Sequence, residues 1–257
     1  MTEIDDNQHY CLTMVRDADM ARYATLLFAP GPARRALLAL YAFNQELAQT
    51  RHKVSEAMIG EIRLQWWQEA IEGLAAGQVR DHPVIQELAT LSGLSEVTPF
   101  LYRLIAARKS DLYQEGPQNF ETLAEYADAV GGSLSQAASI VCQQPNLVAA
   151  RNSGRAWTML GLLRAALYEE SESPNTEHKP QDFLPLYKNM AGFVRENLDG
   201  ATGVKPHSSV FLLNAVTDLH MALIEKYNYA PKRIKAKDAG NLRLLWTVSK
   251  AAITGNY

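Results

Sequence analysis

The chain has 257 residues, of which 47% are hydrophobic and 21% are charged, and its formal net charge is −3. This composition is typical of a globular protein, and a chain of this length buries roughly three quarters of its unfolded surface. The slight acidic excess argues against a general attraction to nucleic acid or to anionic lipid.

The first ten residues are acidic and polar, which is not the pattern of a targeting segment. No apolar run reaches the roughly 20 residues that a membrane span needs. The two cysteines, Cys11 and Cys142, match no metal or redox spacing and indicate a reducing compartment. We therefore expect a cytoplasmic protein, with peripheral contact to the inner membrane left open as an alternative.

Helical periodicity dominates the sequence, whereas strand signals are scarce. Apolar residues recur at three- and four-residue steps from 33 to 53, and Gly31-Pro32 suits the start of a helix there. Further helices are predicted, in chain order, at 55–73, 84–91, 96–113, 120–142, 146–170, 187–198, 209–227 and 242–254. Gly131-Gly132 inside one of them indicates a kink or a close approach between helices.

The connections between these helices are short, with one exception. The stretch 171–181 is polar, contains two prolines and is predicted to be a loop. Because no long linker divides the chain, we expect a single all-α domain over residues 1–257. Disorder at residues 1–14 is left open by their polar composition.

The segment Tyr41–Gly73, YAFNQELAQTRHKVSEAMIGEIRLQWWQEAIEG, resembles the squalene/phytoene synthase family. In that family a Tyr-Ala-Phe-like stretch leads into an Arg-Leu-x-x-Trp-Trp-like segment. Further ordered pieces agree with the family: Arg34-Arg35, Asp111-Leu112, Tyr126-Ala127, Gly131-Gly132, Gly154-Arg155-Ala156, Leu162-Leu163-Arg164 and Phe183-Leu184-Pro185. The resemblance covers about residues 15–190 and implies an isoprenoid-synthase-like helical bundle.

The family's chemistry depends on two Asp-x-x-x-Asp motifs, which hold magnesium ions around the diphosphate of a prenyl substrate. Residues at i and i+4 share one helix face, so both carboxylates point the same way, and magnesium prefers oxygen ligands. Aligned with the family, the first motif falls on Ala48 and His52, and the second on Ala165 and Glu169. Alanine offers no ligand and histidine offers nitrogen, which suits magnesium poorly. We therefore predict no metal site, no cofactor and no confident catalytic residue.

Other charged groups of the sequence do not replace the missing aspartates. Glu121, Glu125 and Asp128 share a helix face and are interpreted as solvated, as are Glu169-Glu170 at a helix end. The basic stretch 232–237 is interpreted as a solvated face rather than a contact with an anionic surface. The six histidines show no spacing typical of a zinc site.

Several residues on the same helices are candidates for the wall of a cavity or for the diphosphate side: Arg34, Tyr41, Asn44, Gln45, Arg51, Arg164 and Tyr168. Whether such a cavity is open or filled is not visible in the sequence. Trp66 and Trp67 point in different directions on one helix, so at most one lines a cavity and core packing is the default for both.

The string Phe43–Gln49, followed by Val54-Ser55-Glu56 and Arg63-x-Gln65-x-Trp67, also resembles one branch of the family. That branch contains a mitochondrial complex I assembly factor and likewise lacks the paired aspartates. The resemblance implies a non-catalytic scaffold or assembly factor whose partners are membrane-complex subunits. Two alternatives stay open: a magnesium-dependent prenyltransferase that condenses two isoprenoid diphosphates, and a non-catalytic protein that binds an isoprenoid or lipid ligand.

Overall fold

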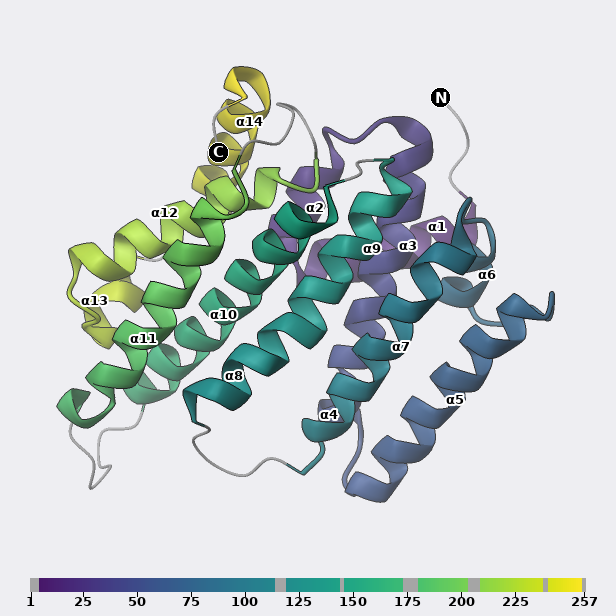
Figure 1. Cartoon of the computed structure of the whole chain (residues 1–257), viewed down its shortest axis with the longest axis horizontal. Helices are drawn as coiled ribbons and strands as arrows, with labels where there is room; N and C mark the ends of the chain where they lie inside the picture. Colours follow the sequence, from purple (N-terminus) through teal and green to yellow (C-terminus); the bar gives the residue numbers. More distant parts are fainter. Residues whose placement is uncertain are drawn as a thin grey trace. The chain divides into compact units, whose positions relative to one another are not determined.

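The computed structural model describes residues 5–113, 119–143, 146–172, 180–202, 209–237 and 240–255. Within these ranges all regular structure is helical (Figure 1), which confirms the predicted all-α fold. The helices are α1 (Asp6–Ala18), α2 (Met20–Leu26), α3 (Gly31–Ala48), α4 (Thr50–Lys53), α5 (Ala57–Ala75), α6 (Pro83–Ala89), α7 (Leu94–Ser110), α8 (Phe120–Ala127), η1 (Asp128–Gly132), α9 (Ser133–Val141), α10 (Leu147–Glu172), α11 (Pro180–Asp199), α12 (Leu212–Lys226), α13 (Pro231–Ala236) and α14 (Asn241–Thr254). None of these helices combines the length and the apolarity needed to cross a membrane.

The residues group by their contacts into two compact units. The first unit comprises residues 1–116 and 133–147, and the second comprises residues 117–132 and 148–257. The expectation of a single domain stays a prediction, and each unit is described by itself.

Several predicted boundaries need correction. The helix predicted over 33–53 begins earlier, at Gly31, and ends at Ala48. The predicted loop 171–181 is shorter at both ends, because α10 continues through Glu172 and α11 starts at Pro180. Residues 173–179 lie outside the described part of the chain.

The suggestion of disorder at residues 1–14 is wrong for residues 6–14, which lie in α1. Asp5 caps this helix by accepting a hydrogen bond from the backbone N–H of Gln8 at 2.9 Å. Only Cys11 and Val15 of α1 are buried, a pattern too sparse to predict the helix. Contacts of α1 with α3 and α6 stabilise it instead.

In the first unit, α3 packs against α1, α6, α7 and α9, and α7 packs against α5 and α9. The rings of Phe43 and Trp67 meet edge to face with their centroids 5.5 Å apart, and both side chains are buried. Each such burial contributes roughly 1.5–3 kcal/mol or more to stability. Trp67 packs in the core, whereas Trp66 is half-buried and its ring meets that of Trp67 edge to face with the centroids 5.0 Å apart.

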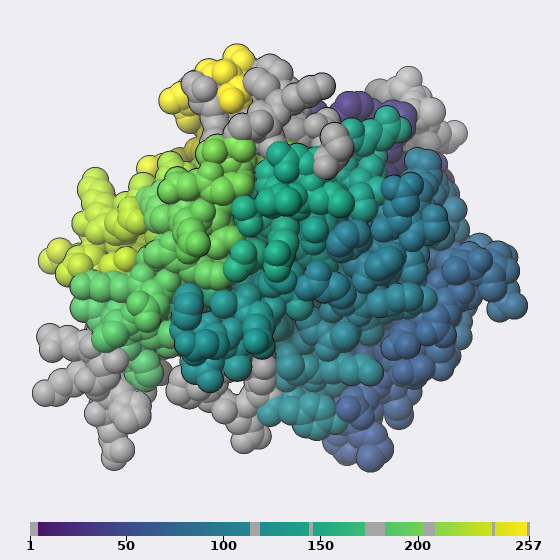
Figure 2. Space-filling model, in the orientation of Figure 1, coloured from purple at the N-terminus to yellow at the C-terminus, as the bar shows by residue number. Residues whose placement is uncertain are grey.

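In the second unit, α11 packs against α8 and α12, and α14 packs against α12. Arg195 of α11 donates to Glu225 of α12 through both Nε and Nη2, at 2.9 and 2.7 Å. Figure 2 shows the side chains of these two helices, in green and yellow-green, as a continuous surface. A buried bond between the Ser153 hydroxyl and the Asn214 side-chain oxygen, 2.6 Å long, joins α10 to α12.

The glycine pair lies in a π-helical turn, η1, which interrupts the helical run between α8 and α9. A Cβ added at Gly131 would overlap the carbonyl oxygen of Gly154 and the hydroxyl of Thr158 on α10. The predicted close helix approach is thereby confirmed. Asp128 begins this turn and pairs with Arg151 of α10 at 2.5 and 2.9 Å, so its interpretation as a solvated carboxylate is wrong.

Replacing Gly131 by alanine is expected to lower the free energy of unfolding by roughly 1–3 kcal/mol, because backbone atoms of α10 must move to admit the methyl group. Gly192→Ala on α11 is the matched control, since no atom lies within 4 Å of the added Cβ. The control variant should be neutral or up to about 1 kcal/mol more stable. Urea unfolding of both variants measures the difference, and equal midpoints would contradict the close approach.

Candidate functional site

The helix that would carry the first aspartate motif is interrupted at that motif. Helix α3 ends at Ala48, and the separate four-residue helix α4 begins at Thr50 after Gln49. Ala48 is half-buried, whereas Arg51 and His52 on α4 are exposed. The two motif positions are therefore not on one continuous helix, and the rule that places i and i+4 on one face does not apply to them.

One turn before this interruption, α3 carries a buried carboxylate, Glu46, whose side chain is 1% exposed. Three side chains reach it: the Tyr10 hydroxyl donates to one oxygen at 2.6 Å, and Arg63 Nη2 and Lys53 Nζ donate to the other at 2.8 and 3.5 Å. These four residues, which we call the Glu46 cluster, come from α1, α3, α4 and α5. The hydroxyl of Thr50 also donates to the Glu46 carbonyl at 3.2 Å, across the break between α3 and α4.

Electrostatics keep Glu46 ionised. Burial alone would raise its pKa, but the hydrogen bond from Tyr10 and the charges of Lys53 and Arg63 outweigh burial and lower the pKa below its ordinary value of 4.5. Burial, and then the hydrogen bond to Glu46, raise the pKa of the Tyr10 hydroxyl. Three donors thus hold the carboxylate, which suits a fixed cross-link between helices and not proton transfer to a substrate.

His82 closes the apolar side of the cluster. Its ring meets those of Tyr10, Trp66 and Trp67 edge to face, with centroids 6.0, 5.7 and 4.9 Å away. Burial lowers the pKa of this imidazole, which therefore favours the neutral form. Its Nδ1 accepts the backbone N–H of Val84 at 3.2 Å and caps α6.

The sequence alone did not identify Glu46, Tyr10 or Arg63 as candidate site residues, although Glu46 and Arg63 lie in the motif pieces. A signal for Glu46 was present, because it is the one carboxylate in the apolar run 37–47, where a charge needs a partner. Nothing in the sequence identifies which partners reach it, since Tyr10 is 36 residues away along the chain.

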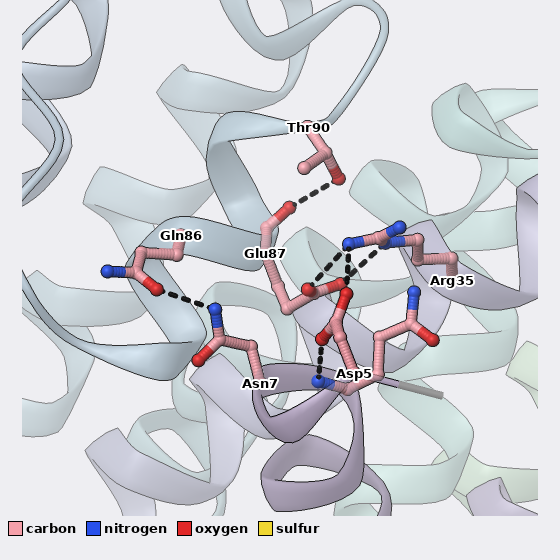
Figure 3. Close-up of polar contacts among 7 residues, drawn as sticks. Asp5, Asn7, Arg35, Gln86, Glu87 and Thr90 are labelled. Atoms are coloured by element: carbon pink, nitrogen blue, oxygen red, sulfur yellow. Dashed lines mark hydrogen bonds and ion pairs between the residues drawn. The ribbon is translucent and has the colours of Figure 1, made fainter. Parts of the chain in front are cut away.

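The two arginines at the start of α3 have different roles. Arg35 donates two hydrogen bonds of 2.8 Å to the buried carboxylate of Glu87 on α6 and one of 3.2 Å to Asp5, as Figure 3 shows. Such bidentate pairs are strong and directional. The exposed Arg34, which the sequence suggested for the diphosphate side, instead donates to the backbone carbonyls of Leu27 and Ala29.

The other candidates on α3 lie within the first unit's interior. Tyr41 is 4% exposed, and the guanidinium of Arg22 lies 5.5 Å from its ring centre. Asn44 is 5% exposed and accepts a hydrogen bond from Arg108 at 3.4 Å, whereas Gln45 is half-buried. Tyr41 and Asn44 thus pack against other residues of the same unit.

The second motif lies on α10, which is continuous at these positions. Ala165 and Glu169 are both exposed, and they share a helix face at i and i+4. Arg164 lies 5.9 Å and Lys235 lies 6.0 Å from the ring centre of Tyr168. The ring of Tyr168 therefore lies within cation–π distance of two cations of the second unit.

A groove of about 720 Å³ lies along α1 and reaches Gln49, next to the first motif position. Among the described residues, its walls include the carboxylates of Asp6 and Asp17 and contain no lysine or arginine. Asp17 pairs with the neighbouring Arg16 at 3.0 Å, and the carboxylates of this wall would repel a diphosphate. In the described part of the chain, no three His, Cys, Asp or Glu side chains lie close enough together to hold a metal ion. Alanine and histidine at positions 48, 52 and 165 do not fit the magnesium that the family's chemistry requires.

Glu46→Gln tests the cluster through its pH dependence. Because the folded-state pKa of Glu46 is lowered, the carboxylate's contribution is fully present above the ordinary value of 4.5 and is lost as the pH falls through the folded-state pKa. Wild type should therefore lose stability more steeply below about pH 5 than Glu46→Gln, which should be less stable at neutral pH by roughly 1–3 kcal/mol. Urea unfolding between pH 7 and pH 3 measures both curves. Tyr10→Phe removes a single donor to Glu46 and should lower the free energy of unfolding by about 1 kcal/mol at neutral pH. If the stability of wild type and of Glu46→Gln changes with pH in parallel, Glu46 is not stabilised as an ionised carboxylate by the cluster.

Comparison with known proteins agrees with this fold and these motifs. Residues 15–185 match the model of the squalene/phytoene synthase family. The chain is 33% identical over 181 residues to the mouse (Mus musculus) NADH dehydrogenase (ubiquinone) complex I, assembly factor 6, covering 69% of this chain and 52% of the relative. The human (Homo sapiens) protein of the same name is 30% identical over 196 residues, covering 74% of this chain and 58% of the relative. This chain thus spans little more than half the length of those relatives.

Among solved structures, a crystal structure of a dehydrosqualene synthase in complex with ligand superposes with a TM-score of 0.73. The match covers 96% of this chain and 97% of that chain at 15% sequence identity, a level that supports the fold alone. Together, the motif pieces on α3, α5 and α10, the helical fold and the family match lead to one conclusion. The chain belongs to the squalene/phytoene synthase family.

Proposed function

We propose that this protein is a non-catalytic member of its family that acts as an assembly factor for respiratory complex I. The observation that carries the proposal is its similarity to the mouse and human proteins named complex I assembly factor 6, at 33% and 30% identity over about 70% of this chain. The partners would then be subunits of that membrane complex.

The residues at the motif positions support the loss of catalysis. Alanine at 48 and 165 supplies no ligand, and His52 lies on a separate short helix. Metal-assisted departure of diphosphate is worth several kcal/mol of transition-state stabilisation, which corresponds to orders of magnitude in rate. The exposed Glu169 alone does not replace a cluster of carboxylates.

The recognised segment also supports a scaffold role. Three residues of the string from Phe43 to Gln49 make contacts inside the first unit. Phe43 makes a ring contact with Trp67, Asn44 accepts a hydrogen bond from Arg108, and Glu46 makes the ion pairs of the Glu46 cluster. These interactions stabilise the helices and engage those side chains within the unit. A second candidate function, a magnesium-dependent prenyltransferase, is favoured by membership of the family and by the fold.

The assembly role predicts a defect confined to complex I. Deleting the gene in its host should lower NADH:ubiquinone oxidoreductase activity of isolated membranes several-fold and leave succinate oxidation unchanged, because only one complex depends on the factor. Blue-native electrophoresis should show less assembled complex I. An unchanged amount of complex I in the deletion strain would contradict the proposal, and re-expression of the chain from a plasmid is the control.

The absence of catalysis is tested separately with purified protein. Incubation with farnesyl or geranylgeranyl diphosphate and magnesium should release no pyrophosphate above the enzyme-free background, since three of the four motif positions lack a carboxylate. A dehydrosqualene synthase is the positive control and should be faster by about 10³-fold or more. Magnesium-dependent release of pyrophosphate would favour the prenyltransferase instead.

A further inference from the structure

Helix α14 has apolar side chains on two opposite faces. Leu244, Val248 and Ala251 are buried, and α14 packs against α12 of the same unit (Figure 1). On the other side are three large apolar residues, which we call the outer stripe: Leu242, Trp246 and Ile253, exposed by 85, 71 and 78%. At about 100° per residue, the outer stripe falls within about 40° of one direction, opposite to the buried face.

The outer stripe is not needed to attach α14 to its unit, because the buried stripe already does this. A surface helix normally presents polar residues to water, and clustered exposed apolar side chains indicate an interaction surface. Trp246 is the most informative of the three, since an indole has a large apolar body and an N–H that prefers a polar boundary.

The charge of this region identifies the occupant. Residues 231–254 contain six basic side chains and one acidic side chain, an excess of five positive charges in a chain whose net charge is −3. Lys232 and Arg233 on α13 are exposed, whereas Lys235 pairs with Glu172. Arg243 and Lys250, also exposed, lie seven residues apart on α14 and therefore flank the same side of the outer stripe.

We infer that α14 lies flat on an anionic lipid bilayer, with the outer stripe inserted at the level of the headgroups. Apolar residues that include tryptophan, flanked by lysine and arginine, are the features of helices that bind in the plane of a membrane interface. The basic residues of α14, together with those of α13 that the sequence alone favoured as a solvated face, add attraction to anionic headgroups within a Debye length of the surface. A second copy of the chain is a poorer occupant, since a symmetric contact through this face would bring the positive charges of the two copies together.

A second exposed apolar face, on α5, has the opposite character. On α5, Met58 and Ile62 are 69 and 64% exposed, and the exposed carboxylates of Glu56 and Glu61 lie near them in sequence. Anionic lipid would be repelled by this face. It therefore supplies a matched control, with equally exposed apolar side chains but negative surroundings.

The test is co-sedimentation of the full chain with two kinds of vesicle. Neutral vesicles contain phosphatidylcholine alone, and anionic vesicles contain about 30 mol% phosphatidylglycerol in phosphatidylcholine. Wild type should bind the anionic vesicles at least about tenfold more strongly than the neutral ones, and added salt should weaken the binding. The double variant Leu242→Ser/Trp246→Ser should lose about tenfold or more of that binding. Met58→Ser/Ile62→Ser should bind as wild type does, and circular dichroism should show that both variants remain folded.

Three outcomes would overturn the inference: no binding to either vesicle, equal binding to both, or unchanged binding of the α14 variant. If wild type does not bind vesicles and the α14 variant changes the oligomeric state measured by light scattering, the outer stripe joins two copies of the chain and the membrane contact is excluded. Brominated lipid should quench wild-type fluorescence more than that of Trp246→Phe, which keeps the other three tryptophans. The inference does not depend on the proposed function, because the test contains no respiratory complex.

Discussion

The first unit depends on a buried carboxylate, that of Glu46. Glu46 is 1% exposed, and burying an isolated carboxylate is so costly that it must be paired or neutralised. Its donors come from α1, α4 and α5, so the positions of three other helices are tied to α3 by the same two oxygens. Removal of any partner would leave the buried carboxylate with too few hydrogen-bond donors in a region of low dielectric. Because losing one donor is so costly, the cluster fixes the positions of the helices that supply it.

The cluster also bears on chemistry at the end of α3. The helix stops at Ala48, directly after the turn that carries Glu46, and the Thr50 hydroxyl and the Lys53 ammonium return to Glu46 from the next short helix. The first motif region is therefore organised around a saturated internal carboxylate. A metal site needs the reverse arrangement, in which carboxylates keep free oxygens for the ion.

The second unit is held together by different means. Its helices approach closely at Gly131, where no side chain intervenes, and the Asp128–Arg151 pair lies beside that contact. Arg195 joins α11 to α12 through a bidentate pair with Glu225. Around these links, α14 attaches through Leu244 and Val248 and leaves Trp246 exposed, so that one helix serves both packing and the proposed membrane contact.

The sequence by itself determined the helical class, the family and the absence of aspartate at positions 48, 52 and 165, because periodicity and residue type are local properties. It also indicated the close approach at Gly131-Gly132, since only glycine permits it. Only the tertiary structure decided that residues 6–14 form a helix, that α3 breaks at Gln49, and that Tyr10 and Arg63 surround Glu46. Those outcomes depend on partners up to 36 residues apart in the chain, and a pattern within one segment contains no information about which distant side chain will reach it.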